Sequence, residues 1–314
     1  MATLNIGTSR ALPLPPVTVG EDELRFVSPE EGIPADAVAY LATAVDPVDA
    51  ALIERLPASV GLIANLGVGF DNIDRDAAAR RGLIVSNTPV VTEDTADLSF
   101  ALILAAARRL GEGERYLRAG KWAGGGIPPV GTRVNGATLG IVGFGAIGRA
   151  VARRATGFGM KILYIDQAES PAASQTGAEY RPSLHDLLSQ ADIVTLHAPL
   201  TVETHNMIDA GALATMKQGA VLVNAARGPL VDENALIAAL ESGHIAAAGL
   251  DVFVDEPAVP RRLMEMEQVV LTPHIGSATA QCRSDMVQRG IGNIVRFLRD
   301  GSVNDPVPLP QSAV

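Results

Sequence analysis

Short apolar runs recur along the chain from Thr138 onward, separated by stretches of helical or turn character: LGIVGF, KILYID, ADIVTLH, AVLVNA, AAAGLDVF and VVLTPHI. These runs are apolar throughout and do not alternate with polar residues, as is typical of strands that helices cover on both faces of a sheet. The pattern predicts an α/β fold in which helical crossovers connect the strands of a parallel sheet.

A second and smaller set of apolar runs lies upstream: VAYLAT, VGLIANLG and GLIVSNTP. It predicts another parallel α/β unit, so we expect two Rossmann-like or flavodoxin-like domains. The opening segment from Gly7 to Pro34 is rich in proline and glycine and offers only one clear strand, FVSP. We therefore expect the strand–helix pattern to be poor before Tyr40.

Three further segments indicate how the domains are connected. Asp94 to Leu110 predicts a long helix whose apolar body would be buried between domains or in a dimer contact. Gly124 to Gly131 (GGGIPPVG) predicts a flexible joint that leads into the next strand. Ala278 to Arg299 predicts a final helix that crosses back to pack on the N-terminal unit.

We expect one domain to be inserted into the other. Residues 99–282 would form the inserted domain, and residues 1–98 with 283–314 would form the second, discontinuous domain, with a cleft between the two. The chain has 314 residues, of which 47% are hydrophobic and 19% charged, so it can bury the cores of two domains.

The charge and the lengths of the apolar runs exclude several classes of protein. A net charge of −10 with scattered arginines argues against nucleic-acid binding and against a polybasic membrane surface. No apolar stretch approaches the roughly 18 to 20 residues that span a bilayer. The N-terminus lacks the pattern of a secretory signal, and Cys282, the single cysteine, cannot form an internal disulfide. We therefore expect a soluble cytoplasmic protein.

A glycine motif, with Gly143, Gly145 and Gly148, follows the run LGIV and precedes a helical stretch. Between a strand and a helix, these glycines allow a tight turn and let a pyrophosphate approach the N–H groups of the helix N-terminus. The motif predicts a dinucleotide site, and the alternative is a simple glycine turn. No set of residues has the spacing of a metal-ligand cluster.

Asp166 stands at the end of the next run, KILYID. A carboxylate at this position accepts hydrogen bonds from the adenosine ribose hydroxyls and repels the 2′-phosphate of NADP. Gln167, the next residue, supplies no cation that would compensate. We expect NAD to be preferred over NADP, and the alternative is that Asp166 is only a solvated turn residue.

Three later segments each place ionisable groups just after a buried run: NAARGPLVD, GLDVFVDEP and LTPHIGSAT. Ligands of open α/β sheets bind outside the carboxyl ends of the strands. Arg227, Asp251, Glu256 and His274 should therefore converge on one crevice. A histidine there suits proton transfer near neutral pH, and an arginine suits a substrate carboxylate.

With the glycine motif and the HAPLT stretch (His197 to Thr201), these segments resemble the D-isomer-specific 2-hydroxyacid dehydrogenase family. The phrases NLGVGFDNID and TEDTADLSFALILAAARR resemble glyoxylate and hydroxypyruvate reductases within that family. The resemblance implies an NAD(H)-dependent oxidoreductase that interconverts a small 2-oxo acid and the D-2-hydroxy acid. It also implies a homodimer, a substrate domain formed by residues 1–98 and 283–314, and an NAD-binding domain formed by residues 99–282.

The family roles carry over to matching positions. His274 would be the acid/base, with Glu256 stabilising its protonated form, and Arg227 would bind the substrate carboxylate and polarise the carbonyl. The backbone N–H groups of Val68 and Gly69 would bind the same carboxylate. Asp251 would contact the nicotinamide carboxamide. The other positions implied around the cofactor are Ala146, Ile147, His197, Pro199, Ala225, Ala226, Arg227, His274 and Gly276.

Alternatives remain open for the whole chain and for single residues. The chain could be a non-catalytic NAD-sensing protein like the corepressors that resemble this family, or a structural protein with a vestigial cofactor motif. Asp251 could be a helix cap, Glu256 a turn residue, Arg227 a structural ion pair, and His197 purely structural. Trp122 is expected to be a packing or subunit-contact residue. We assign no chemistry to His185, His205, His244 or Cys282. The sequence does not identify the substrate.

Overall fold

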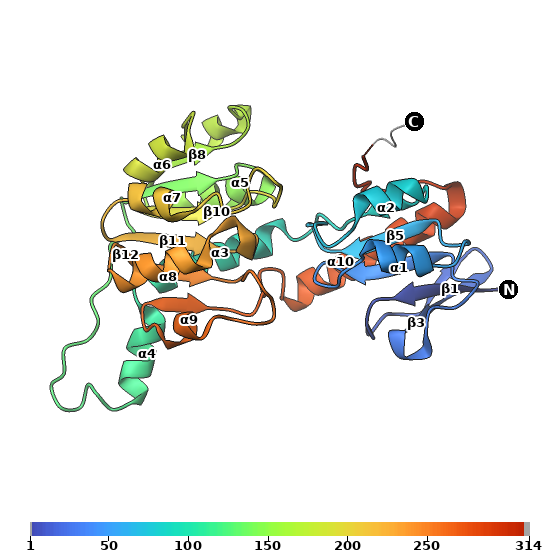
Figure 1. The fold of residues 1–314 in the computed structure, drawn as a ribbon, viewed down its shortest axis with the longest axis horizontal. Coiled ribbons are helices and arrows are strands. Elements are labelled where there is room, and N and C mark those ends of the chain that lie inside the picture. Colours follow the sequence, from blue (N-terminus) through green and yellow to red (C-terminus); the bar gives the residue numbers. More distant parts are fainter. Residues whose placement is uncertain (1, 311–314) are drawn as a thin grey trace. The chain divides into compact units, whose positions relative to one another are not determined.

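The computed structural model describes residues 2–310 and divides into two compact units (Figure 1). Unit 1 comprises the described residues up to Val91 and those from Ala278 onward, and unit 2 comprises Thr92–Ser277. The boundaries expected after residues 98 and 282 fall within the first helix of unit 2 and the last helix of unit 1. The assignment of the substrate to unit 1 and of the cofactor to unit 2 stays a prediction.

Unit 2 is built on a seven-stranded sheet in the order β13-β12-β11-β10-β7-β8-β9, in which every neighbouring pair is parallel. The apolar runs downstream of Thr138 all form strands, so the expected parallel sheet is confirmed. The short edge strand β9 was not predicted. The strands are β7 (Thr138–Val142), β8 (Lys161–Ile165), β9 (Glu179–Tyr180), β10 (Ile193–Leu196), β11 (Ala220–Asn224), β12 (Ile245–Leu250) and β13 (Val269–Leu271).

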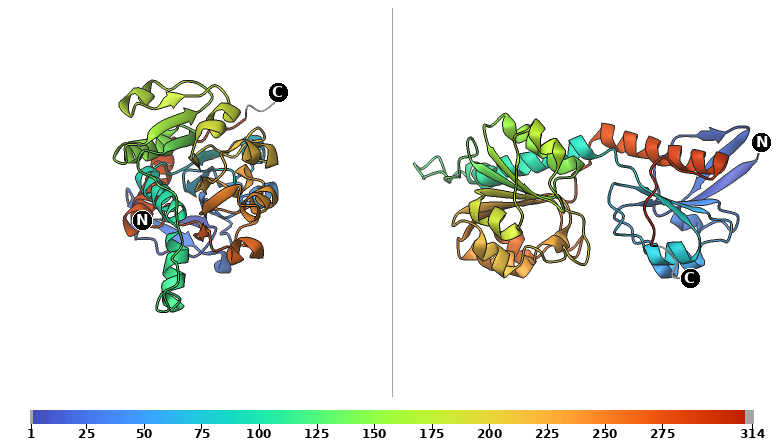
Figure 2. Two further views of the ribbon diagram at one scale, coloured as in Figure 1. Left: turned by 90° about the vertical axis from the view of Figure 1, so that its left-hand side faces the viewer. Right: turned by 90° about the horizontal axis from the view of Figure 1, so that it is seen from above.

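Helices cover both faces of this sheet (Figure 2). Successive side chains of a strand point to opposite faces, so Val221 packs with one set of helices and Leu222 with the other. This arrangement explains why the runs are apolar at every position. Helices α3 (Thr92–Ala107) and α5 (Ala146–Thr156) cover one face, and α6 (Leu184–Gln190), α7 (Ala210–Thr215) and α8 (Glu233–Glu241) cover the other; α9 (Arg261–Glu265) precedes β13.

The expected long helix ends earlier than predicted, and a second helix follows it. Helix α3 ends at Ala107, and α4 (Leu110–Arg118) begins after Arg109, whose φ is +53°. Helix α4 and residues 119–131 project from the rest of unit 2 (Figure 1). We call residues 108–131 the arm. The two ends of the arm lie next to each other, because the N–H of Thr132 donates to the carbonyl of Ala107 at 2.7 Å.

Unit 1 contains a six-stranded sheet in the order β2-β3-β1-β4-β5-β6, parallel except for the antiparallel pair β2 and β3. The expectation of a poor pattern before Tyr40 is wrong, since three strands form there. The prolines of this region lie in the connections between β1 and β2 and between β3 and β4, where they interrupt no sheet hydrogen bond. The strands are β1 (Thr3–Thr8), β2 (Val17–Val19), β3 (Asp22–Val27), β4 (Ala39–Thr43), β5 (Leu62–Leu66) and β6 (Ile84–Ser86).

The N-terminal and the C-terminal parts of the described chain both belong to unit 1. Helices α1 (Ala50–Arg55) and α2 (Arg75–Arg80) cover one face of the sheet, and α10 (Ala280–Asp300) covers the other, as expected for the final helix. The apolar face of α10 includes Met286 and Ile294, both buried. No helix within residues 2–310 combines the length and the apolar character needed to cross a membrane.

Candidate active site

The residues singled out in unit 2 follow successive parallel strands and therefore meet at one edge of its sheet. In the order of the strands across the sheet, they are His274 after β13, Asp251 after β12, Arg227 after β11, His197 after β10, Gly143 after β7 and Asp166 after β8. Arg227 and His274 thus share one half of the edge with Asp251, and His197, the glycine loop and Asp166 lie along the other half. This edge is where ligands of α/β sheets bind.

The glycine loop joins β7 to α5 and fits a pyrophosphate. A Cβ atom on Gly148 would lie 2.2 Å from the carbonyl oxygen of Gly143, so only glycine allows this close packing of helix on strand. A Cβ on Gly145 would meet nothing within 4 Å, and no side chain caps α5 at this N-cap residue. The first N–H groups of α5, at Ala146 and Ile147, are therefore accessible to an anionic ligand.

Asp166 is bonded to the same loop. Its Oδ2 accepts the N–H of Phe144 at 2.7 Å, and its Oδ1 accepts the N–H of Gln167 at 2.7 Å. Phe144 is buried, and its ring stacks on Tyr164 of β8 with 4.1 Å between centroids. The carboxylate therefore has a fixed place beside the glycine loop.

His197 packs behind the glycine loop and carries no charge at neutral pH. A Cβ on Gly143 would lie 2.6 Å from the carbonyl carbon of His197, and the ring Nε2 of His197 lies 3.0 Å from the hydroxyl of Thr195. Burial lowers the pKa of His197 to about 3. Pro199, further along this connection, is exposed, and its carbonyl accepts the hydroxyl of Thr204 at 2.7 Å.

Arg227 follows β11 and the residues Ala225 and Ala226. The side-chain oxygen of Asn224 accepts the N–H of Ala226 at 3.0 Å, and its amide donates to the carbonyl of Arg227 at 2.8 Å, so Asn224 fixes this turn. The Arg227 guanidinium donates to the carbonyl of Ala226 at 2.7 Å. Its positive charge lies close enough to Glu256 to help lower the pKa of that carboxyl group.

Asp251 organises the turn that carries His274. Its side chain is 1% exposed and accepts the hydroxyl of Thr272 at 2.6 Å and the N–H groups of Ile275 and Gly276, each at 2.8 Å. The N–H of His274 donates to the backbone carbonyl of Asp251 at 2.8 Å. Burial raises the pKa of Asp251, although these hydrogen bonds act in the opposite direction. Asp251 thus fixes the backbone on both sides of the histidine.

Glu256 and His274 form an ion pair at this edge. The distance between His274 Nδ1 and Glu256 Oε2 is 2.7 Å, and the other carboxylate oxygen accepts the N–H of Phe253 at 3.0 Å. Burial acts to raise the pKa of Glu256, but the hydrogen bond and charge of His274, the Phe253 N–H and the charge of Arg227 together lower it. Nδ1 of His274 is thus engaged, and the side chain is 31% exposed, which leaves Nε2 to serve a ligand.

Val68 and Gly69 lie in unit 1, in the loop after β5. Their carbonyls accept the side-chain amides of Asn87, at 2.8 Å, and Asn65, at 2.7 Å. Within the described residues, the N–H groups of Val68 and Gly69 donate no hydrogen bond. Val68 is exposed and Gly69 half-buried. Two backbone donors at one loop can therefore receive an anionic ligand.

The sequence did not identify the residues that hold the loops of His274 and Glu256 in place. Thr272 lies within the quoted LTPHIGSAT segment, but only its bond to Asp251 indicates its role. Glu233 of α8 likewise accepts the N–H of Val254 at 2.9 Å, in the loop that carries Glu256. Cys282 is buried against the sheet of unit 1. Among residues 2–310, no group of histidine, cysteine and acidic side chains is arranged to hold a metal ion.

Comparisons with known proteins agree with this arrangement. A family model described as the NAD binding domain of D-isomer specific 2-hydroxyacid dehydrogenases matches residues 100–276. The chain is 45% identical over 307 residues to a glyoxylate reductase from Pyrococcus furiosus, which covers 93% of this chain and 91% of that protein. The chain belongs to the D-isomer-specific 2-hydroxyacid dehydrogenase family. As a 2-hydroxyacid dehydrogenase it is a nicotinamide-dependent oxidoreductase, as the glycine loop predicts.

Two solved 2-hydroxyacid dehydrogenase structures resemble the whole chain. A glyoxylate reductase from Paecilomyes thermophila has a TM-score of 0.87 at 34% identity, with 98% of each chain covered. An NADPH-dependent glyoxylate/hydroxypyruvate reductase from Sinorhizobium meliloti, in complex with NADP and malonate, has a TM-score of 0.85 at 31% identity, with 99% of each chain covered. Both support the fold of two parallel-sheet α/β domains expected from the sequence.

Proposed function

We propose that the chain is a glyoxylate or hydroxypyruvate reductase that uses NADH to reduce a small 2-oxo acid to the D-2-hydroxy acid. The observation that carries this proposal is the hydrogen bond of 2.7 Å between Glu256 and His274. The turn of His274 is fixed by Asp251, and the charge of Arg227 reaches Glu256. A general acid, an anion that stabilises its protonated form and a guanidinium are the groups that carbonyl reduction requires.

The residues of unit 2 would bind the dinucleotide along the edge of the sheet. The glycine loop of Gly143, Gly145 and Gly148 has the open N-terminus and the close helix packing that a pyrophosphate requires. His197, Pro199, Ala225, Ala226 and Gly276 belong to the loops that follow the neighbouring strands. We assign the adenosine ribose to Asp166 and the nicotinamide carboxamide to Asp251. The bound nicotinamide supplies the hydride.

The chain's own side chains would then bind the substrate and move one proton. Arg227 would bind the carboxylate and carbonyl oxygen of the 2-oxo acid through its planar fork of donors. The N–H groups of Val68 and Gly69 would bind the same carboxylate. His274 would donate the proton on Nε2 to the carbonyl oxygen as it becomes an alkoxide, and Glu256 would hold Nδ1 throughout. In the oxidative direction, His274 would accept that proton.

We propose NAD as the preferred nicotinamide cofactor. The negative charge of Asp166 beside the glycine loop would favour ribose hydroxyls and repel a 2′-phosphate. The Sinorhizobium meliloti relative was solved with NADP, so the family accommodates both cofactors. Asp166, followed by the uncharged Gln167, is the feature of this chain that supports NAD.

The exposed side chains of the arm support the homodimer that the resemblance implies. Several large apolar residues of the arm are exposed to solvent: Leu110 (58%), Leu117 (58%), Trp122 (62%), Ile127 (87%) and Val130 (83%). Apolar side chains gathered on a projecting segment are typical of a protein–protein interface. We propose that the arm packs on a second copy of the chain, with Trp122 as a contact residue. We also propose a cytoplasmic location, in which the buried Cys282 stays reduced.

The experiment that tests the reductase is turnover of NADH with a panel of 2-oxo acids that includes glyoxylate, hydroxypyruvate and pyruvate. Oxidation of NADH with glyoxylate or hydroxypyruvate is expected, and chiral analysis of the product should give the D isomer where the product is chiral. Tight NADH binding without oxidation by any member of the panel would instead favour the corepressor-like sensor. The intact set of Arg227, Glu256 and His274, and the relationship to glyoxylate reductases, favour the enzyme.

A further inference from the structure

The loop from Gly67 to Phe70 is held by hydrogen bonds to three successive carbonyls. The carbonyl of Gly67 accepts the N–H of Thr88 at 2.9 Å, that of Val68 accepts the amide of Asn87 at 2.8 Å, and that of Gly69 accepts the amide of Asn65 at 2.7 Å. A peptide plane has its C=O and N–H groups on opposite sides. Each carbonyl shares its plane with the N–H of the next residue. Thr88 therefore fixes the direction of the Val68 N–H, Asn87 that of the Gly69 N–H, and Asn65 that of the Phe70 N–H.

The start of the loop has little freedom to move. Gly67 has a φ of +152°, and a Cβ atom there would lie 2.4 Å from the Cβ of Ala44. The hydroxyl of Thr88 accepts the N–H of Gly67 at 2.8 Å, so Thr88 binds both backbone groups of this glycine. Glycine is required at this position because a side chain would force the loop away from Ala44.

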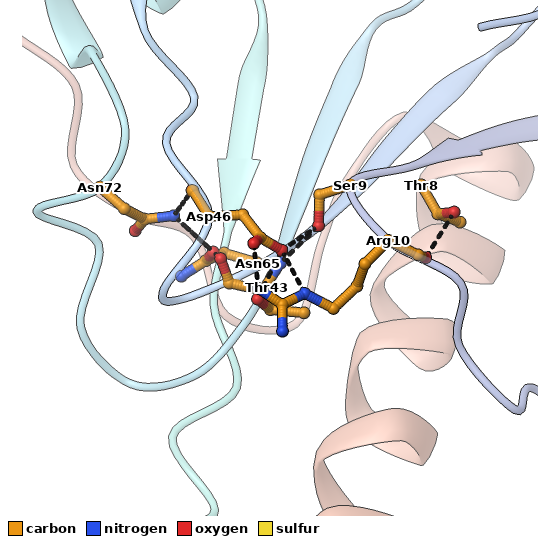
Figure 3. A network of polar contacts seen from close by, with 7 residues as sticks. All are labelled: Thr8, Ser9, Arg10, Thr43, Asp46, Asn65 and Asn72. Atoms are coloured by element: carbon orange, nitrogen blue, oxygen red, sulfur yellow. Dashed lines mark hydrogen bonds and ion pairs between the residues drawn. The ribbon is translucent and has the colours of Figure 1, made fainter. Parts of the chain in front are cut away.

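Asn65 is itself oriented by a network that extends to the end of β1 (Figure 3). Its side-chain oxygen accepts the amide of Asn72 at 3.2 Å, so its own amide must point toward Gly69. The amide of Asn72 also donates to the backbone carbonyls of Thr43, at 3.1 Å, and Asp46, at 2.9 Å. Asn65 is 1% exposed, so water cannot replace these contacts.

Asp46 fixes the far end of this network (Figure 3). Its carboxylate accepts the hydroxyls of Ser9, at 2.5 Å, and Thr43, at 2.7 Å, and the Nε–H of Arg10 at 2.8 Å. These donors come from the ends of β1 and β4, the central strands of the sheet. The orientation of the Asn65 amide is thus tied to the two central strands of unit 1.

We propose that Asn87 and Asn65 are positioning residues of this loop: Asn87 aims the N–H of Gly69 at the carboxylate of the 2-oxo acid, and Asn65 holds the following peptide plane, so that Gly69 is fixed on both sides. The inference rests on the proposed function, because it takes the substrate carboxylate as the ligand of this loop. Neither asparagine touches the substrate. Each acts through the peptide it holds, so its loss should weaken the binding of carboxylates and leave the dinucleotide site of unit 2 unchanged.

Asn87→Ala is the principal test, because its side chain is only half-buried and the variant should fold. Asn5→Ala is the matched control. Its amide also belongs to unit 1, but it donates to the carboxylate of Asp36 at 3.0 Å and has no bond to the loop. Asn65→Asp is the second variant. It keeps the shape of the side chain and replaces the donor to the Gly69 carbonyl by an acceptor.

The measurements are the Kd of oxamate for the NADH-bound protein, the Kd of NADH, KM and kcat with glyoxylate, and the thermal midpoint. Oxamate is an unreactive carboxylate of the shape of a small 2-oxo acid. In Asn87→Ala and Asn65→Asp we expect oxamate binding to weaken and KM to rise by about tenfold, the effect of one misplaced hydrogen bond to a charged group. NADH affinity should stay within about twofold, and Asn5→Ala should match the parent throughout.

The outcomes separate this inference from the function on which it rests. If the parent reduces glyoxylate and binds oxamate, but both loop variants match Asn5→Ala in oxamate affinity and KM, the positioning role is wrong and the reductase stands. If kcat and NADH affinity fall in the loop variants while oxamate affinity is retained, the asparagines have a different role and the inference is also wrong. A parent that neither binds oxamate nor reduces any 2-oxo acid would overturn the inference together with the proposed function.

Discussion

The hydroxyl of Thr272 donates to Asp251 Oδ1 at 2.6 Å, two residues before the histidine that we assign as the acid/base. Thr272→Val keeps the shape of the side chain and removes this bond, which leaves a buried carboxylate with one donor fewer. We expect kcat to fall by about three- to tenfold with little change in NADH affinity. Thr215→Val is a suitable control, because the Thr215 hydroxyl only donates to Gly211 within α7. Equal kcat values for Thr272→Val and the parent would show that Asp251 holds the turn without it.

Glu256→Gln should shift the pH dependence of the two reaction directions oppositely. The pKa of Glu256 is lowered, so the carboxylate is ionised at neutral pH and stabilises the protonated form of His274. Without that anion, the imidazolium loses its proton more readily. Reduction, which needs the protonated histidine, should fail at a lower pH than in the parent, whereas oxidation should stay active further into acid.

The pH profiles of kcat/KM in both directions, with hydride transfer shown to limit the rate, measure this effect. Glu233→Gln is the matched control, because Glu233 bonds the same loop at Val254 but does not contact His274. If Glu256→Gln and Glu233→Gln both left the profiles in place, the acid–base pair would need another explanation.

Arg227→Lys should lose activity although the positive charge is kept. A compact ammonium cannot reproduce the two parallel donors of a guanidinium on a carboxylate. We expect kcat/KM for glyoxylate to fall by about 10- to 100-fold, while the Kd of NADH changes little. Steady-state kinetics and NADH fluorescence titration measure the two effects. Parental turnover in Arg227→Lys would remove this residue from the substrate site.

Asp166→Ala should reduce the preference for NAD. The variant loses a ribose contact and the repulsion of a 2′-phosphate, and it also loses the bond to the Phe144 N–H. We expect the ratio of kcat/KM with NADH to kcat/KM with NADPH to fall by about tenfold or more. An unchanged ratio would place cofactor selection elsewhere in the chain.

His197 should make the protein less stable in mild acid. Burial lowers its pKa from 6.5 to about 3, so between these values the unfolded chain binds a proton that the folded chain does not. The folded state therefore has its full stability above pH 6.5 and loses stability as the pH falls toward 3. His197→Asn should reduce this loss, seen as a smaller drop in thermal midpoint between pH 7.5 and 5. His205→Asn, at an exposed histidine, should behave like the parent.

The sequence predicted the sheet of unit 2 and the edge of that sheet at which Arg227, Asp251 and His274 lie, because both depend on local signals. Apolar runs mark strands that are buried on both faces, and polar residues directly after them, such as Arg227, Asp251 and His274, must lie at one edge of a parallel sheet. The distance of 2.7 Å between Glu256 and His274 could not be predicted, because it depends on how two loops fold back on each other.

Features that depend on distant partners were missed. Strand β1 (TLNIGT) has polar residues at alternate positions and is a strand because β3 and β4 pair with it on both sides. Asn65 lies inside an apolar run, before Leu66, and no pattern indicates its bond to Gly69. The break between α3 and α4 at Arg109 was likewise missed, because the helical pattern continues across it.

The discontinuity of unit 1 has a consequence for the order in which the protein acquires its structure. The face of its sheet that includes Leu41 and Leu62 is covered by α10, so it stays exposed until the last helix leaves the ribosome. By then the whole of Thr92–Ser277 has been synthesised and, since its contacts are internal, can already have folded. The N-terminal strands, although made first, should therefore be the last to become protected, and they should depend most on chaperones during translation.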